Sequence, residues 1–151
     1  MPSLEGATTW LNGSEDEIGQ SIAGKPVLVH FWAVSCGICK DKMPQLNEIK
    51  ARYGALGLQT IAVHMPRYEA DTDLDMVNEA MRGNRIEEPT AVDSLHKLKD
   101  AFQNEQGWVP VYYLFDAEGK LKTRAAGEFG ITVLQTALDK MFVTQAAGAQ
   151  A

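Results

Sequence analysis

The sequence VLVHFWAVSCGIC, residues 27–39, is an almost unbroken apolar run that ends in two cysteines. Its valines and aromatic residues are typical of a strand buried on both faces, and a helical pattern follows it directly. Cys36 and Cys39 are separated by two residues and are the only cysteines of the chain. Two thiols at a strand-to-helix turn can close a small disulfide ring and reopen it with little backbone movement. We therefore expect redox chemistry at this pair.

The two thiols are expected to have different roles. The free amides and the dipole at the N-terminus of a helix stabilise a thiolate, which favours Cys36. We expect Cys36 to lie within reach of solvent and to attack a disulfide, and Cys39 to resolve the intermediate. Inert core thiols and a zinc site are the alternatives. Zinc needs two more ligands, and His30, His64 and His96 show no partner motif at ligand spacing.

Length and charge limit the classes of protein. A chain of 151 residues with 45% hydrophobic residues can bury one ordinary core, so we predict one domain at residues 1–143. Residues 144–151 are small and polar, which predicts a disordered tail. The net charge of −6 argues against nucleic acid or an anionic membrane as partner, because both need a basic face. A monomer is expected.

The expected location is the cytoplasm. No stretch approaches the length of a membrane span, and the first residues, Met1–Gly6, lack the basic and apolar regions of a secretory signal. An extracytoplasmic location is the alternative if a leader was removed. In the reducing cytosol, a lone cysteine pair is more often catalytic than structural.

Hydrophobic periodicity predicts strands and helices along the whole chain. Ser14 fits a helix N-cap, Gly54 fits a helix end, and Leu74 and Leu95 are expected on buried helix faces. Besides the central strand, we expect strands at residues 8–11, 58–65, 90–92, 111–115 and 120–126, and helices that end near residues 22, 53, 81, 102 and 141. This order predicts an α/β sandwich with a mixed sheet.

Two sets of residues carry a family resemblance. Phe31-Trp32-Ala33-x-x-Cys36-Gly37-x-Cys39-Lys40 resembles the active-site segment of thioredoxins. The flanks, Lys25-Pro26-Val27-Leu28-Val29 and Met43-Pro44, are similar to the TlpA/ResA-like branch, and above all to its small soluble Bacillus-type members. The resemblance covers nearly all of the chain. It implies a thioredoxin fold, with a mixed central sheet flanked by helices and a helical insertion within residues 67–88.

The resemblance also implies a substrate-binding set. A cis proline lies beside the cysteines in this family, and Val109-Pro110 is the match. A cis Pro110 would turn the carbonyl and amide of Val109 toward an extended substrate peptide; a simple strand-entry proline is the alternative. Trp32 matches the tryptophan that flanks thioredoxin active sites, and its other role is to pack against the cysteine helix. Ser35 replaces a second tryptophan, so Trp108 is expected to restore part of the apolar surface.

His30 is a departure from the family pattern. Thioredoxin has a buried acid there, which is thought to help deprotonate the resolving cysteine. A neutral imidazole could take the proton of Cys39 instead, since its ordinary pKa of about 6.5 lies near working pH. The alternative is a hydrogen-bonded core histidine.

These observations predict a thiol-disulfide oxidoreductase that reduces disulfides of protein substrates in the cytosol. Gly37-Ile38 places no basic residue between the cysteines, which favours a reductant. No Gly-rich dinucleotide fingerprint is present, so we expect no bound cofactor or metal and a separate thioredoxin-reductase-like electron donor.

Three alternatives stay open. An extracytoplasmic reductase in cytochrome c maturation fits the branch, but Lys42 stands where ResA-like proteins carry an acid. A thiol peroxidase shares the fold, but the threonine-bearing peroxidatic motif is absent. A metal carrier would use the thiols and His64.

Overall fold

The computed structural model describes the backbone of residues 1–150 and the side chains of residues 1–143. Disorder is predicted for residues 144–151. The side chains of residues 144–150 and the whole of residue 151 lie outside this description. The domain boundary at residue 143 therefore stays a prediction.

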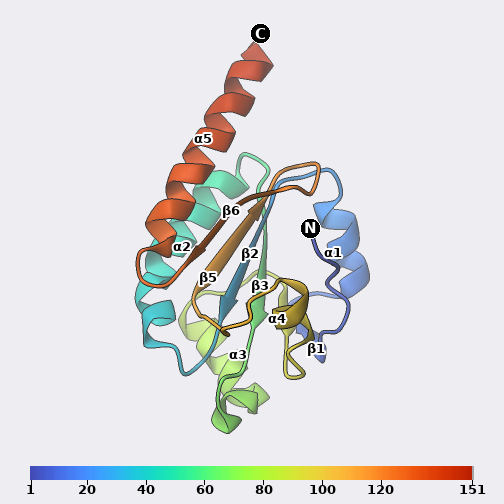
Figure 1. Cartoon of the computed structure of the whole chain (residues 1–151), viewed down its shortest axis with the longest axis vertical. Coiled ribbons are helices and arrows are strands. Elements are labelled where there is room, and N and C mark those ends of the chain that lie inside the picture. Colours follow the sequence, from blue (N-terminus) through green and yellow to red (C-terminus); the bar gives the residue numbers. More distant parts are fainter. Residues whose placement is uncertain (151) are drawn as a thin grey trace.

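A six-stranded mixed sheet forms the centre of the molecule (Figure 1). Strands β2, β3 and β4 are parallel to one another, whereas β1, β5 and β6 are antiparallel to their neighbours. The sheet has the order β1-β4-β3-β2-β5-β6. The bounds of the strands are β1 (Thr9–Leu11), β2 (Val27–Trp32), β3 (Gln59–His64), β4 (Thr90–Val92), β5 (Val111–Phe115) and β6 (Leu121–Ala126).

Helices cover both faces of this sheet, which makes an α/β sandwich of the thioredoxin-like kind, as predicted. Helices α2, α3 and α5 pack on one face, and α1 and α4 pack on the other (Figure 1). The bounds of the helical elements are α1 (Glu15–Ile22), α2 (Gly37–Gly54), the 3-10 helix η1 (Glu69–Thr72), α3 (Leu74–Gly83), α4 (Lys97–Ala101) and α5 (Gly130–Gln150).

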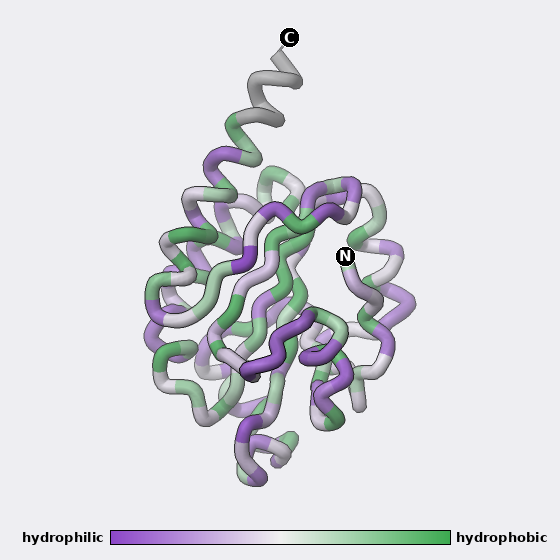
Figure 2. The backbone as a smooth tube through the Cα atoms, viewed as in Figure 1, coloured by the Kyte–Doolittle hydropathy of each residue, from purple (hydrophilic) through white to green (hydrophobic). Residues whose placement is uncertain are grey.

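The alternation of β2 divides the core in two. Leu28 and Trp32 belong to the cluster under α2, while Val29 and Phe31 belong to the cluster on the opposite face. Figure 2 shows hydrophobic residues concentrated along the central strands and hydrophilic ones on the outer helices and loops. Because all six residues of β2 are buried, this strand fixes the position of whatever follows it.

Two predicted core positions are wrong. Leu74 is the first residue of α3 and Leu95 precedes α4, and these side chains are 41% and 64% exposed. Helix α4 starts only at Lys97, because His96 has a left-handed backbone with φ 56°. Within these segments, Val77, Met81, Leu98 and Phe102 are the buried side chains.

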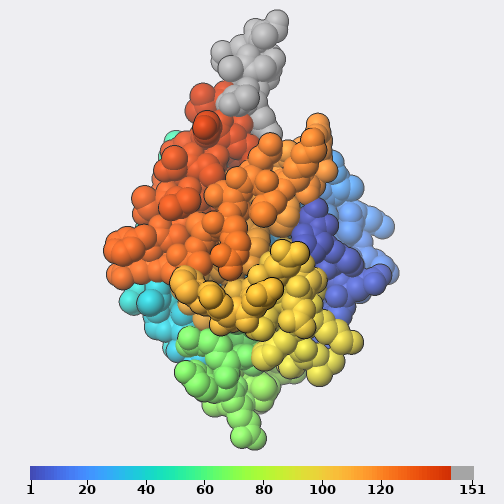
Figure 3. All heavy atoms as spheres, viewed as in Figure 1, coloured from blue at the N-terminus to red at the C-terminus, as the bar shows by residue number. Residues whose placement is uncertain are grey.

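The predicted insertion lies between β3 and β4 and consists of η1 and α3. It forms the green lobe at one end of the molecule in Figure 3. Val77 and Met81 attach the lobe to the core under α2. The insertion thus brings η1 to the end of the sheet at which β2 and β3 finish.

Candidate active site

The sheet brings three distant segments together at one of its ends. Trp32, the last residue of β2, pairs with His64, the last residue of β3. Phe31 pairs with Val111, the first residue of β5. The turn that leads to Cys36, the insertion and the loop before β5 therefore meet at this end.

Cys36 and Cys39 form the predicted pair and are joined by a disulfide, with their Cα atoms 5.3 Å apart. Cys36 is the N-cap of α2, and its Sγ accepts a hydrogen bond of 3.0 Å from the backbone N–H of Cys39. The Cys36 N–H donates to the carbonyl of Ala33 at 3.0 Å. The first sulfur is thus placed at the positive end of a helix dipole, where a thiolate is stabilised.

Cys36 is less accessible to solvent than we predicted. Cys36 is 3% exposed and Cys39 is 2% exposed. In the closed ring the Cys36 sulfur faces its bonded partner and the helix amide, which leaves little of it for water. Ser35, Gly37 and Ile38 around it are exposed, so the sulfur lies just under the surface.

The loop before β5 carries the predicted proline. The Val109-Pro110 peptide bond is cis, as the resemblance implied. Pro110 is buried and Val109 is half-buried, and no described residue forms a hydrogen bond with the backbone of Val109. Trp108 is 50% exposed. The fully buried Asn104 holds this loop, since its side chain bonds both the N–H (3.1 Å) and the carbonyl (2.9 Å) of Trp108.

Trp32 has a packing role in this structure. It is 1% exposed, and its ring forms a T-shaped pair with the ring of His64, with 4.8 Å between centroids. Both belong to the packing between the sheet and the start of α2. With the disulfide closed, Trp32 is therefore out of direct reach of a substrate.

His30 lies in a buried group of charges. Its Nε2 is 2.7 Å from Oε2 of Glu88, whose Oε1 is 2.7 Å from Nζ of Lys50. The side chains of His30, Glu88 and Lys50 are 1%, 7% and 15% exposed. Burial by itself would raise the pKa of Glu88, but the hydrogen bond and charge of His30, together with Lys50, lower it to about 2. Glu88 is therefore ionised at neutral pH.

His64 has a different environment on the next strand. It is fully buried, and its Nε2 accepts a hydrogen bond of 3.2 Å from the N–H of Val34. Burial lowers the pKa of His64 to about 4, although the charge of Asp71 acts in the opposite direction. Its Nδ1 has no hydrogen-bond partner. His64 is thus a neutral acceptor that fixes the turn before the cysteines.

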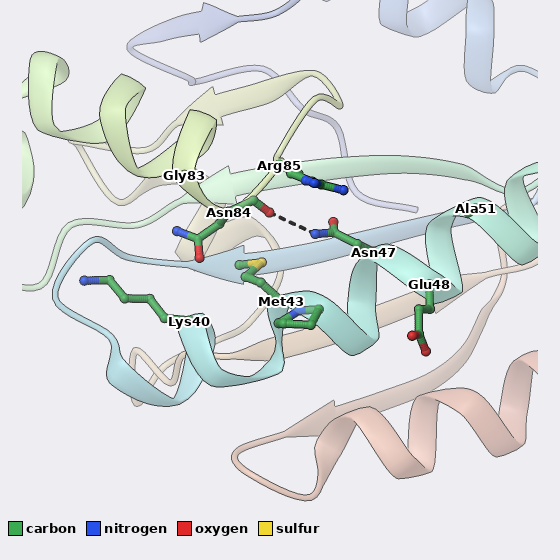
Figure 4. Close-up of a pocket in the computed structure, with 9 residues that line it drawn as sticks. Lys40, Met43, Asn47, Glu48, Ala51, Gly83, Asn84 and Arg85 are labelled. Atoms are coloured by element: carbon green, nitrogen blue, oxygen red, sulfur yellow. Dashed lines mark hydrogen bonds between the residues drawn. The ribbon is translucent and has the colours of Figure 1, made fainter.

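A pocket of about 530 Å³ lies between α2 and the end of α3 (Figure 4). Lys40, Met43 and Arg85 are among its lining residues, but neither cysteine is. Figure 4 shows Asn47 reaching across it to the carbonyl of Asn84, a hydrogen bond of 2.9 Å. The contact ties the insertion to α2, so this pocket belongs to the packing rather than to the redox pair.

Three polar residues at the site were not found from the sequence: Glu88, Asp71 and Asn104. Asp71 lies in η1, is 2% exposed and accepts hydrogen bonds from Ser35. Each sits in a segment with many other polar residues, and no motif distinguishes it. In the part of the chain that the structure describes, no group of three or more His, Cys, Asp or Glu could hold a metal ion.

The chain matches known proteins over most of its length. The family model described as Redoxin matches residues 1–138. The chain is similar to the thiol-disulfide oxidoreductase YkuV of Bacillus subtilis, with 44% identity over 141 residues, which is 93% of each protein. It is similar to the thiol-disulfide oxidoreductase ResA of Bacillus cereus, with 28% identity over 80% of this chain and 65% of that protein.

Solved structures show the same fold. A solution structure of a thioredoxin-like protein in the oxidized form has a TM-score of 0.83 and 42% identity, and 95% of each chain is covered. These matches confirm the predicted resemblance to thioredoxin-like proteins of the TlpA/ResA-like branch. Among the described residues, no helix is both long enough and apolar enough to span a membrane.

Proposed function

Because this chain belongs to the Redoxin family and is a thiol-disulfide oxidoreductase with Cys36–Cys39 as its redox-active disulfide, we propose that it reduces protein disulfides in the cytosol. The observation that carries the proposal is the position of Cys36. Its sulfur caps α2 at the end of the sheet where the loop of Pro110 also lies, and the residues between the two cysteines, Gly37 and Ile38, carry no charge. No charge between the two cysteines adds to the stabilisation of the thiolate by the helix, which suits a reductant.

The reaction is an exchange of two electrons between sulfur pairs. In the reduced protein, the Cys36 thiolate attacks one sulfur of a substrate disulfide, and the other substrate sulfur leaves as a thiolate. Cys39 loses its proton and attacks the Cys36 sulfur of the mixed disulfide, which releases the second substrate sulfur. The protein ends with the Cys36–Cys39 disulfide and the substrate with two thiols.

His30 is the group that we propose for the proton of Cys39. An ionised carboxylate can only accept hydrogen bonds, so Nε2 of His30 must donate to Glu88 and carry the proton of the neutral ring. This leaves Nδ1 as the basic nitrogen. Glu88 would also stabilise the imidazolium that forms when Nδ1 takes a proton.

We place the substrate on the surface around the disulfide. An extended peptide could pair with the free amide and carbonyl of Val109 next to the cis Pro110. Trp108 and Ile38 offer apolar contacts, and Phe129 follows Gly127, whose N–H bonds the carbonyl of Pro110 at 2.9 Å. These three side chains are 50%, 42% and 76% exposed. Such a surface suits disulfides in unfolded or loosely folded segments.

We also propose that the protein is a monomer and that a separate protein supplies its electrons. A thioredoxin-reductase-like protein would reopen the Cys36–Cys39 disulfide, because the sequence has no Gly-rich fingerprint for a nicotinamide or a flavin.

Assays of the reduced protein and its reduction potential test this function. We expect reduction of insulin disulfides, slow consumption of peroxide, and a reduction potential near the thioredoxin value of about −270 mV. A Cys39→Ser variant should stop at the mixed disulfide, which mass spectrometry detects. Fast peroxide consumption without insulin reduction would point to a peroxidase. A potential as high as about −120 mV would make the protein an oxidant and overturn the proposal.

A further inference from the structure

The turn that leads to Cys36 is held by side chains from distant segments. The N–H of Val34 donates to His64, and the N–H of the next residue, Ser35, donates to Oδ1 of Asp71 at 3.0 Å. The hydroxyl of Ser35 donates to Oδ2 of Asp71 at 2.8 Å. Two successive amides of the turn thus depend on buried polar side chains, and both lie immediately before Cys36.

Asp71 is a rigid anchor. Besides Ser35, its carboxylate accepts the backbone N–H groups of Arg67 (2.9 Å) and Tyr68 (3.2 Å). Four donors on a side chain that is 2% exposed satisfy most of its lone pairs. Burial by itself would raise the pKa of Asp71, but these hydrogen bonds lower it below its usual value. A negative charge is therefore fixed beside Ser35, the residue that precedes the attacking cysteine.

Arg67 brings the opposite charge to the same residue. Its Nε and Nη2 donate to the Ser35 hydroxyl at 3.2 and 3.1 Å. The guanidinium lies over the ring of Tyr68 and is exposed. Ser35 therefore stands between a buried carboxylate and a surface cation. The other titratable groups beside the turn are His64 at the end of β3 and Lys40 in the first turn of α2.

We propose that Asp71 and Arg67 are positioning residues that set the reactivity of Cys36 in opposite directions. Asp71 fixes the turn, and its charge opposes ionisation of the Cys36 thiol, which keeps the pair reducing. Arg67 favours the thiolate and, from the surface, an approaching anionic substrate. The inference rests on the proposed role of Cys36 as the attacking thiol, and it assigns to the insertion a part in the redox chemistry.

Opposite shifts in the pKa of Cys36 test the proposal. We expect Asp71→Asn to lower this pKa by about one unit, because a like charge is removed. The more stable thiolate favours the reduced form. If it favours that form tenfold in the exchange equilibrium, the reduction potential rises by about 30 mV. Arg67→Gln should raise the pKa by less, about half a unit, because solvent screens an exposed charge. Alkylation rates of the reduced protein against pH give the pKa, and equilibration with glutathione gives the potential.

Glu69→Gln is the matched control. Glu69 lies in the same 3-10 helix, is exposed and is not among the hydrogen-bond partners of Ser35, so the same change of charge should leave the pKa of Cys36 unmoved. Equal shifts in this control and in Asp71→Asn, or shifts of the same sign for Asp71→Asn and Arg67→Gln, would overturn the proposal. If Asp71→Asn does not fold, the absence of a rise in Arg67→Gln overturns it alone. These readouts need no protein substrate, so a failure of insulin reduction would sink the proposed function and not this inference.

Discussion

His30 and His64 lie on adjacent strands, are both at most 1% exposed, and are nevertheless held in opposite ways. Nε2 of His30 faces the ionised carboxylate of Glu88 and must donate to it. Nε2 of His64 accepts the N–H of Val34 and must be unprotonated. In the neutral rings the proton is therefore on Nε2 of His30 and on Nδ1 of His64.

The difference shows that the hydrogen-bond partner of a buried histidine decides which ring nitrogen stays free. His30 keeps a basic nitrogen free and has a carboxylate to stabilise its cation. His64 has its basic nitrogen occupied by the turn, and its remaining N–H has no partner. With its pKa lowered to about 4, His64 serves as a neutral support for the cysteine loop. Of these two rings, His30 is the one whose free nitrogen suits the proposed role of proton acceptor.

The largest effect is expected from breaking the partner of His30. Glu88→Ala leaves His30 and Lys50 without their shared carboxylate inside the protein. Removing the carboxylate costs about 4 kcal/mol, because the charge of Lys50 and the N–H of His30 stay buried without their partner. We expect this loss in the free energy of unfolding, measured with urea at neutral pH.

Glu87→Ala is the control for that loss. Glu87 is the preceding residue, carries the same charge and is exposed, so its removal should change the free energy of unfolding by less than about 0.5 kcal/mol. If the two variants lose the same stability, the contacts of Glu88 with His30 and Lys50 contribute nothing to the fold.

The contrast also shows what the sequence could and could not predict. The central strand, the cysteine pair, the end of α2 at Gly54 and the cis Pro110 follow from local patterns and from the family resemblance, and the structure confirms them. The partner of His30 is 58 positions away. Nothing in the segment around Glu88 distinguishes it from its neighbour Glu87, because burial of one carboxylate depends on how β4 packs beside β3.

The same limit applies to the cysteine loop. Ser35 and Asp71 are 36 positions apart, and they meet only because the insertion returns to the end of β3. The exposure of Cys36 was overestimated for a related reason. A helix cap is accessible in an isolated helix, whereas here the closed ring turns the Cys36 sulfur toward the sulfur and the backbone N–H of Cys39.

The pH dependence of stability sharpens the comparison at His64. Its pKa is about 4 in the folded protein against an ordinary value of 6.5, so folding favours the neutral ring. The stabilisation is complete above pH 6.5 and is lost as the pH falls toward 4, by about 3 kcal/mol for this shift. Glu88, with a pKa of about 2 against 4.5, loses its contribution only between pH 4.5 and 2.

Urea unfolding at a series of pH values separates these two groups. His64→Gln has an acceptor for the N–H of Val34 but no titrating ring, so the free energy of unfolding should depend less on pH between 6.5 and 4.5 than in the unchanged protein. In Glu88→Gln, the free energy of unfolding should depend on pH as in the unchanged protein between pH 6.5 and 4.5, and should depend on pH less than in the unchanged protein below pH 4.5. An unchanged slope in His64→Gln would mean that His64 titrates normally and is not protected by burial.

The smallest effect, and the one that decides the role of His30, is expected in the rate of disulfide exchange. His30→Gln keeps an N–H for Glu88 and removes the basic Nδ1, so the buried charges stay paired while the proton acceptor is lost. Water would then take the proton of Cys39, and we expect release of substrate from the mixed disulfide to slow by about a hundredfold, the low end for a lost general base. The dependence of this rate on pH should also change, because the proposed proton acceptor is removed. His96→Gln is the control, because His96 bonds the carbonyl of Pro66 and not the buried charges. A profile that is the same in all three proteins would make His30 a structural partner of Glu88, equal in role to His64 despite its free nitrogen.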